Sequence, residues 1–297
     1  MAKRHVRFEH YAAIDWSGAA RERHKGIAIA ICANIRQAPH LVRPGHRWSR
    51  PEVLDWLVEK MPSNTLVGLD LGISLPFSDC SAFFPGWADS PADAKALWRL
   101  VDEVCGADPH LAASSFVDNV EASRYFRRHG GREGERFHVP DAAHRRGRFR
   151  VTEQAQAAMG CQPYSNFNLV GAAQVGKSSL TGMRVLHRLA GRLPVWPFDP
   201  LPDAGSVVVE IYTAIAAMAG GRTPGRSKMK TLAELDRALV EIGSPAVAGG
   251  GPIDDHKADA LLTAAWLRSA ATREDLWHPR GMTADIAATE GWTFGAP

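Results

Sequence analysis

Acidic side chains stand where apolar runs of this 297-residue chain end or begin. One acid closes each of three apolar runs, and three more open a helical pattern near the C-terminus: Asp15, Asp70, Glu210, Asp254, Asp255 and Asp259. Asp255 and Asp259 are four residues apart, so they share one face of a helix. Taken singly, each acid has a structural explanation as a turn residue or a helix cap. Taken together, they predict a carboxylate cluster.

Such a cluster needs a cation. Two carboxylates about 5 Å apart repel each other by roughly 3 kcal/mol at an effective dielectric constant near 20. Ligation by carboxylate oxygens alone suits Mg2+ or Mn2+, and a pair of these ions can clamp the attacking and leaving oxygens of a phosphodiester. The four cysteines are too far apart in the sequence for a zinc site. The acids therefore predict a Mg2+ or Mn2+ site.

The elements that must position these acids predict an α/β domain. The expected strands are 10–18, 26–33, 40–48, 65–77 and 205–214. The expected helices are 49–61, 90–106, 119–130, 152–160, 178–191, 231–243 and 254–271. We predict a single domain over residues 1–297, in which the stretch from about 78 to 205 is a largely helical insertion. Strands 10–18 and 65–71 are expected to be adjacent and parallel.

The order of these elements resembles a known fold. Three strands, a helix, a strand, a helix, a strand and a helix, with acids on the first strand, the fourth strand and the last helix, look like the ribonuclease H-like fold. More closely, the segments AAIDWSGA, VGLDLGISLPF, NLVGAAQVGKSSLTGMRVLHRL, VVVEIYTA, DDHKADALLTAAW and EGWTFGAP resemble the domain-of-unknown-function 429 family, whose members are predicted RNase H-like nucleases. The resemblance runs from Tyr11 to Phe294 and implies a ribonuclease H-like mixed sheet flanked by helices.

The resemblance implies catalytic roles for Asp15 and Asp70, with Glu210, Asp255 and Asp259 as further candidates. On this basis we expect metal-dependent hydrolysis of DNA or RNA. Asp15 would bridge two Mg2+ or Mn2+ ions, and Asp70 with Asp255 or Asp259 would complete their ligand shells. Glu210 would be a further ligand or would orient the attacking water.

Residues 124–150 predict a nucleic-acid-binding surface outside the resemblance. Nine arginines against three acids give this segment a charge of +6, whereas the rest of the chain carries −3. Aromatic residues lie between the arginines, a pattern typical of surfaces that bind phosphates and stack on bases. A solvated loop is the alternative interpretation. The arginines expected to bind nucleic acid are Arg124, Arg127, Arg128, Arg145, Arg146, Arg148 and Arg150.

Three alternative functions remain open from the residues. GAAQVGKS (171–178) matches a phosphate-binding loop, in which Gly171, Gly176, Lys177 and Ser178 would bind a nucleotide, but few strands follow it. The turns DWSG and DLG are similar to those of sugar kinases and actin, which usually carry two such sheets. A non-catalytic nucleic-acid-binding module would need the arginines but not the acids, so neutralising the acids separates it from a nuclease.

The remaining sequence features favour a cytoplasmic protein. No apolar run approaches the 18 or so residues of a membrane span, and no apolar segment follows MAKRHVRF to make a signal peptide. The four cysteines do not have the density of a secreted disulfide-bonded protein. We therefore expect no membrane association and no disulfide framework.

Overall fold

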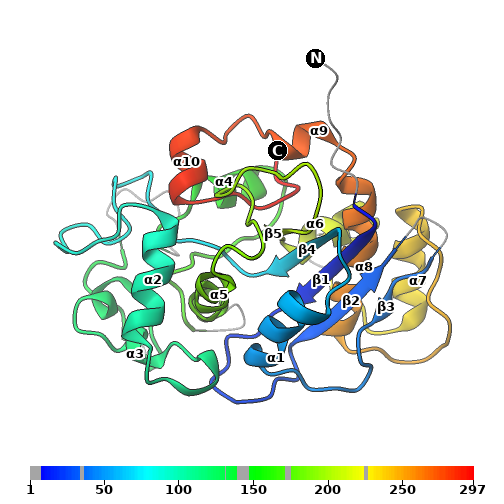
Figure 1. The fold of residues 1–297 in the computed structure, drawn as a ribbon, viewed down its shortest axis with the longest axis horizontal. Coiled ribbons are helices and arrows are strands. Elements are labelled where there is room, and N and C mark those ends of the chain that lie inside the picture. Colours follow the sequence, from blue (N-terminus) through cyan, green and yellow to red (C-terminus); the bar gives the residue numbers. More distant parts are fainter. Residues whose placement is uncertain (1–7, 34–36, 131, 139–146, 171–174, 224–226) are drawn as a thin grey trace.

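The computed structural model describes residues 8–33, 37–130, 132–138, 147–170, 175–223 and 227–297. These residues form an α/β structure around a five-stranded mixed sheet with the strand order β3-β2-β1-β4-β5 (Figure 1). The strands are β1 (His10–Asp15), β2 (Ala28–Cys32), β3 (His40–Leu41), β4 (Thr65–Asp70) and β5 (Val207–Glu210). β1 is antiparallel to β2 and parallel to β4, and β4 is parallel to β5. The prediction that the first and fourth strands are adjacent and parallel is confirmed.

Helices pack against both faces of this sheet. They are α1 (Arg50–Asp55), α2 (Ala94–Val104), α3 (Ser114–Val117), α4 (Val151–Ala158), α5 (Val175–Leu189), α6 (Thr213–Ala219), α7 (Leu232–Glu241), α8 (Asp255–Ala270), α9 (Glu274–Trp277) and α10 (Ala284–Thr289). A π-helical turn over Trp56–Lys60 follows α1 directly. None of the helices in the described ranges is long and apolar enough to cross a membrane.

The two faces of the sheet bury separate apolar cores. Ala12 and Ile14 of β1 lie in one core with side chains of α1, α2 and α5, whereas Ala13 lies in the other with side chains of α6, α7 and α8. This division follows from the alternation of side chains along a strand. Because both faces are covered, β2 and most of β4 are buried throughout. α8 packs across β1 and β2 and buries nearly every side chain from Ala258 to Leu267.

Residues 71–206, between β4 and β5, contribute no strand to the sheet within their described part. The helix expected over 119–130 is wrong, because this stretch holds only a 3-10 turn over Ala122–Tyr125. Phe126 is fully buried, and the backbone of Arg127 then bonds with Phe167 and Leu169. These bonds use the peptide groups that a continuing helix would need. Helices α3, α6, α9 and α10 were not expected from the sequence.

Candidate functional site

Asp15 and Asp70 end the neighbouring parallel strands β1 and β4 and are partners in the strand register. Register partners on adjacent strands are about 4.8 Å apart and point to the same face of the sheet. Ala13 lies two residues before Asp15, and Leu66 lies four residues before Asp70, so each side chain points to the same face as the aspartate that follows it. Both residues lie in the core formed with α6, α7 and α8. Both carboxylates therefore point toward the face that α8 covers.

Two glycines hold the turns after these strands against α5. A Cβ atom at Gly18 would lie 2.5 Å from the backbone carbonyl carbon of Lys177. A Cβ atom at Gly72 would lie 2.3 Å from the side-chain nitrogen of Asn166 and 2.8 Å from the hydroxyl of Ser179. Only glycine allows so close an approach. The turn after Asp15 and the turn after Asp70 are thus fixed on the same helix.

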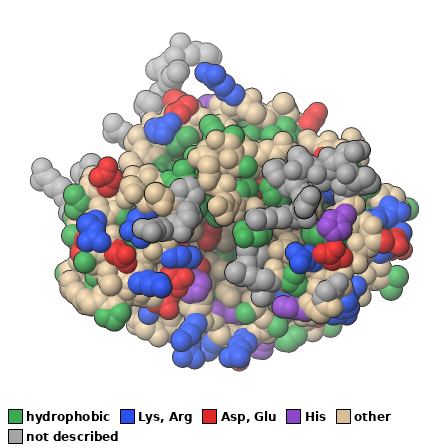
Figure 2. All heavy atoms as spheres, turned by 180° about the vertical axis from the view of Figure 1, so that it is seen from behind, with side chains coloured by type: hydrophobic (Ala, Val, Ile, Leu, Met, Phe, Trp, Pro, Cys, Tyr) green, Lys and Arg blue, Asp and Glu red, His purple; other side chains and the backbone are tan. Residues whose placement is uncertain are grey.

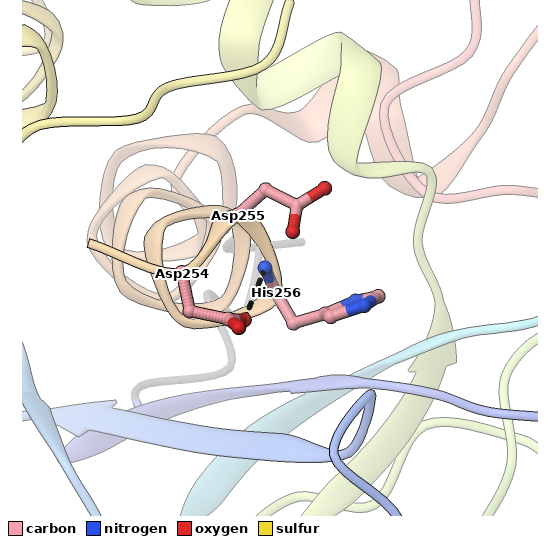
Figure 3. A group of neighbouring side chains, drawn as sticks. All are labelled: Asp254, Asp255 and His256. Atoms are coloured by element: carbon pink, nitrogen blue, oxygen red, sulfur yellow. Dashed lines mark hydrogen bonds between the residues drawn. The ribbon is translucent and has the colours of Figure 1, made fainter. Parts of the chain in front are cut away.

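The start of α8 brings further polar groups to these aspartates. Asp254 caps the helix by accepting a 3.1 Å hydrogen bond from the backbone nitrogen of His256. Figure 3 shows Asp255 and His256 projecting from the first turn to the same side of the helix. The Nδ1 atom of His256 lies 3.0 Å from an Oδ atom of Asp15. The start of α8 is therefore joined directly to the end of β1.

Lys228 closes the cluster from the segment between α6 and α7. Its ammonium donates a 2.8 Å hydrogen bond to Asp259, whose side chain is almost completely buried. The same ammonium lies 3.4 Å from Asp255, which is half-buried. One lysine therefore neutralises part of the negative charge at the start of α8.

Burial sets the charge state of the aspartates. It raises the pKa of Asp15 to about 6, although the hydrogen bond from His256 and its charge lower it. Burial, and after it the charges of Asp15 and Asp259, raise the pKa of Asp70 well above its usual value. Asp70 has no ion pair among the described residues, and the Thr213 backbone nitrogen lies 3.5 Å from it. The cluster is therefore short of positive charge at Asp70.

His256 carries the opposite shift. The hydrogen bond with Asp15 raises the pKa of His256 to about 9, against the effect of burial. Near neutral pH the imidazole is therefore a cation, with Nδ1 donating to Asp15. No role was expected for His256 from the sequence, and the contact with Asp15 now places it in the site.

A cavity of about 410 Å³ opens beside these groups. Asp15, Asp70, Lys228 and His256 line it, together with the turn Trp16–Ala19 and the side chains of Tyr164 and Tyr212. The cavity joins carboxylates, cations and aromatic rings. These groups can bind a cation and a polar, ring-bearing ligand.

The residues present fit a hard divalent cation. Within the described ranges, only Asp254, Asp255 and His256 (Figure 3) place three ligand atoms within 4.8 Å of one another. Asp15, Asp70 and Asp259 do not form such a group. One oxygen of Asp254 already serves the helix cap. Asp15 and Asp70 instead offer neighbouring oxygen donors in a buried setting that lacks a cation, and such donors suit Mg2+ or Mn2+.

Glu210 lies apart from the aspartates, which corrects the expectation that it would join them. Its register partner is Leu69, so its side chain and that of Asp70 point to opposite faces of the sheet. Although Glu210 borders the cavity, its oxygens accept hydrogen bonds from Arg150, from the Ile73 backbone nitrogen and from Thr293. Its carboxylate is therefore already occupied.

Two of the arginines expected on a nucleic-acid-binding surface are buried instead. Arg150 pairs with Glu153 at 2.5 Å and with Glu210 at 2.6 Å. Arg148 pairs with Asp79 at 2.6 Å and donates to the carbonyl oxygens of Pro76, Ala82 and Phe83. Both stabilise the interior, because their guanidinium groups are fully engaged there. The expectation of surface roles for Arg148 and Arg150 is wrong.

The other arginines of the segment lie nearer the surface. Arg124 pairs with Glu121 and Glu135, Arg127 pairs with Glu133, and Arg128 lies 3.7 Å from Asp118. Arg145 and Arg146 lie outside the described residues. On the face seen in Figure 2, basic and acidic side chains are interspersed. Neighbouring acids thus offset much of the positive charge that the sequence concentrates here.

The phosphate-binding-loop pattern lacks its preceding strand. Gly176, Lys177 and Ser178 lie in the first turn of α5, and Gly171 lies outside the described residues. Residues 167–170 form only an isolated bridge at Asn168 rather than a strand of the sheet. Because such a loop connects a strand to a helix, the described residues do not favour nucleotide binding in this mode.

Comparisons of this chain with family models, curated proteins and solved structures found no match.

Sequence reasoning missed Lys228 and gave His256 too little weight. Lys228 lies between two helices in a segment with no periodic pattern, so nothing in the sequence signals its approach to Asp259. One sequence feature could have indicated a role for His256 in the site, because His256 lies in the first turn of the helix that begins with the acids. The contact between His256 and Asp15 spans 241 positions and depends on the packing of α8.

Proposed function

We propose that this chain is a metal-dependent nuclease with a ribonuclease H-like fold, similar to the domain-of-unknown-function 429 family, and that the helices between β4 and β5 are an insertion into that fold. The pairing of Asp15 with Asp70 at the ends of β1 and β4, facing the acidic start of α8, carries this proposal. The strand order β3-β2-β1-β4-β5, with only β2 antiparallel to its two neighbours, supports the fold.

Asp15 and Asp70, with Asp259 or Asp255, would hold Mg2+ or Mn2+. The bound cation would offset the repulsion between the carboxylates and stabilise negative charge on a phosphodiester. Asp70 is the strongest candidate ligand, because it is the aspartate of the cluster that lacks an ion pair among the described residues. Glu210 is left out of the ligand set, since Arg150 already holds it.

The chain itself supplies two positive groups at the cavity. The imidazolium of His256 orients one oxygen of Asp15 and brings a positive charge to the phosphate. The ammonium of Lys228 fixes Asp259 and is more than half exposed, so it can also contact a phosphate oxygen. Tyr164 and Tyr212 provide ring faces for a sugar or a base.

The decisive experiment compares the wild-type protein with Asp15→Asn and Asp70→Asn. Each protein is incubated with single-stranded and duplex DNA and RNA, in Mn2+ and in chelator, while thermal melting checks the fold. Asp89→Asn is the matched control, because Asp89 is an exposed aspartate outside the cavity. We expect the two site variants to lose about 100-fold or more of the cleavage rate and the control to retain it. Undiminished cleavage by a folded Asp15→Asn protein would refute the mechanism.

A non-catalytic nucleic-acid-binding module is the second candidate. It is favoured by the ion pairs of His256 with Asp15 and of Lys228 with Asp259, because these pairs partly neutralise the cluster without a metal. For such a module, the wild-type protein binds a strand without cleaving it in Mn2+, and Asp15→Asn does not weaken the binding. Cleavage in these incubations, together with a measurement of strand binding in chelator, therefore separates the two functions.

A further inference from the structure

A second pocket, of about 200 Å³, borders α5 through Lys177, Leu180 and Thr181. Its basic lining residues are Arg128, His129, Arg132 and Lys177. Ala112, Ala113 and Leu180 form part of its apolar lining. The pocket thus combines a small volume with several cationic groups.

The first turns of α5 form the wall between this pocket and the aspartate cavity. Val175 and Ser178 line the cavity, whereas Lys177 and Thr181 line the pocket. At 3.6 residues per turn, the mean directions of these two pairs differ by about 110° around the helix axis, so the pairs face different sides of α5. Gly18, in the turn after Asp15, borders both spaces. An α-helix with its side chains is about 10 Å wide, a distance that a few consecutive nucleotides can span.

The cations of this pocket have few partners. No carboxylate among the described residues pairs with the Lys177 ammonium, and burial lowers its pKa. The Nε atom of Arg128 is buried without a hydrogen-bond partner. Among the described residues, the Arg132 side chain donates only to the backbone carbonyl of His129. Asp118 is the acid in the lining, and it is 3.7 Å from Arg128. The pocket therefore has unused capacity for an anion.

We propose that the pocket formed by Arg128, His129, Arg132 and Lys177 binds a phosphate group of a nucleic-acid strand whose neighbouring phosphodiester lies at Asp15 and Asp70. The identity of the strand rests on the proposed function. A tetrahedral phosphate fits because guanidinium and ammonium groups surround one small space and donate to its oxygens. By holding one phosphate, the pocket sets which linkage of the strand reaches the aspartates.

The test measures binding in chelator, so that no cleavage is involved. Fluorescence anisotropy follows the same short single-stranded oligonucleotide in three forms: unphosphorylated, 5′-phosphorylated and 3′-phosphorylated. The proteins are the wild type, Lys177→Gln, Arg132→Gln and the matched control Lys60→Gln. Lys60 is exposed and lies before the start of β4, at the opposite end of that strand from Asp70. Arg132 is exposed, so its variant keeps the test valid if Lys177→Gln fails to fold.

We expect Lys177→Gln to weaken binding about tenfold and Arg132→Gln to weaken it measurably, while Lys60→Gln binds like the wild type. The slope of log affinity against log salt should fall by about 0.7 for each lost contact. A loss restricted to one phosphorylated form assigns the pocket to a terminal phosphate monoester. An equal loss for all three forms assigns it to an internal diester, and both results support the proposal.

Two results overturn the proposal. In the first, Lys177→Gln and Arg132→Gln bind each of the three oligonucleotide forms as tightly as Lys60→Gln does. In the second, the wild-type protein binds none of the three forms. Parallel incubations in Mn2+ keep the proposed nuclease function separate. Binding that depends on Lys177, without cleavage, refutes the nuclease and retains the pocket. Cleavage with unchanged binding in both pocket variants refutes the pocket and retains the nuclease.

Discussion

Two groups of carboxylates border one cavity and differ in how they are neutralised. On one side, Glu153 and Glu210 share the guanidinium of Arg150, and a hydroxyl and backbone nitrogens donate to their oxygens. On the other side, Asp15 pairs with His256, while Asp70 has no ion pair among the described residues. The glutamates are therefore a closed structural network, whereas the aspartates retain binding capacity. Proximity to the cavity alone does not distinguish a ligand from a structural acid.

The largest effect is expected from Arg150→Met. This change leaves Glu153 and Glu210 buried without a cation, and breaking a buried pair in this way costs about 3 to 5 kcal/mol. Urea unfolding measures the loss. Arg124→Met is the control, because its partners lie at the surface and its loss should change stability little. Equal unfolding midpoints for the two variants would contradict the contrast between the two groups.

Divalent cations should stabilise the folded protein only by binding to the aspartates. Mn2+ at about 100 times its Kd should stabilise the wild-type protein by about 2.7 kcal/mol, because it binds the folded state alone. Asp70→Asn should abolish this gain, since it removes the carboxylate that most lacks a cation. Differential scanning calorimetry with and without Mn2+ measures the effect. An unchanged gain in Asp70→Asn would place the metal elsewhere.

In chelator, the same change of acid to amide should have opposite effects in the two groups. Asp70→Asn should raise stability by about 1 kcal/mol, because burial and the neighbouring carboxylates disfavour the charged form of Asp70 in the folded protein. Glu210→Gln should lower stability, because it weakens the pairing with Arg150. Chemical unfolding at neutral pH compares the two variants. Changes in stability of the same sign in both variants would show that neutralising an acid has the same effect in the two groups.

The smallest effect concerns His256. NMR titration in chelator should give a pKa near 9 for the wild type and a value near 6.5 in Asp15→Asn. Because the pKa is raised in the folded protein, the pair stabilises it fully below about 6.5 and loses this contribution as pH rises through about 9. The contribution should stay below about 1 kcal/mol, since His256 is about one-third exposed. An unchanged pKa in the variant would contradict the contact.

Much of the central sheet could be predicted from the sequence. The runs ending at Asp15 and Asp70 are continuously apolar, which is typical of strands covered on both faces, and their parallel pairing was expected from their order. The helix beginning at Asp255 was predicted within one residue, because Asp254 is a strong N-cap and the apolar run behind it is long. Local chemistry was sufficient for these elements.

The basic segment could not be interpreted from its composition. Nine arginines in 27 residues predict an exposed nucleic-acid-binding surface, yet Arg148 and Arg150 are buried. Their partners include Asp79, 69 positions away from Arg148, and Glu210, 60 positions away from Arg150. Composition counts charges but does not show which of them meet. Pairing across such distances depends on how the helices between β4 and β5 pack against the sheet.

The sequence by itself determined which acids end the strands and which helix begins beside them. Only the tertiary structure decided that Asp15 and Asp70 share a face while Glu210 points to the other. β5 is apolar on both sides, so its sequence contains no alternation from which a face could be predicted. The register that pairs Leu69 with Glu210 fixes that face, and register arises from packing over the whole sheet rather than from local residues.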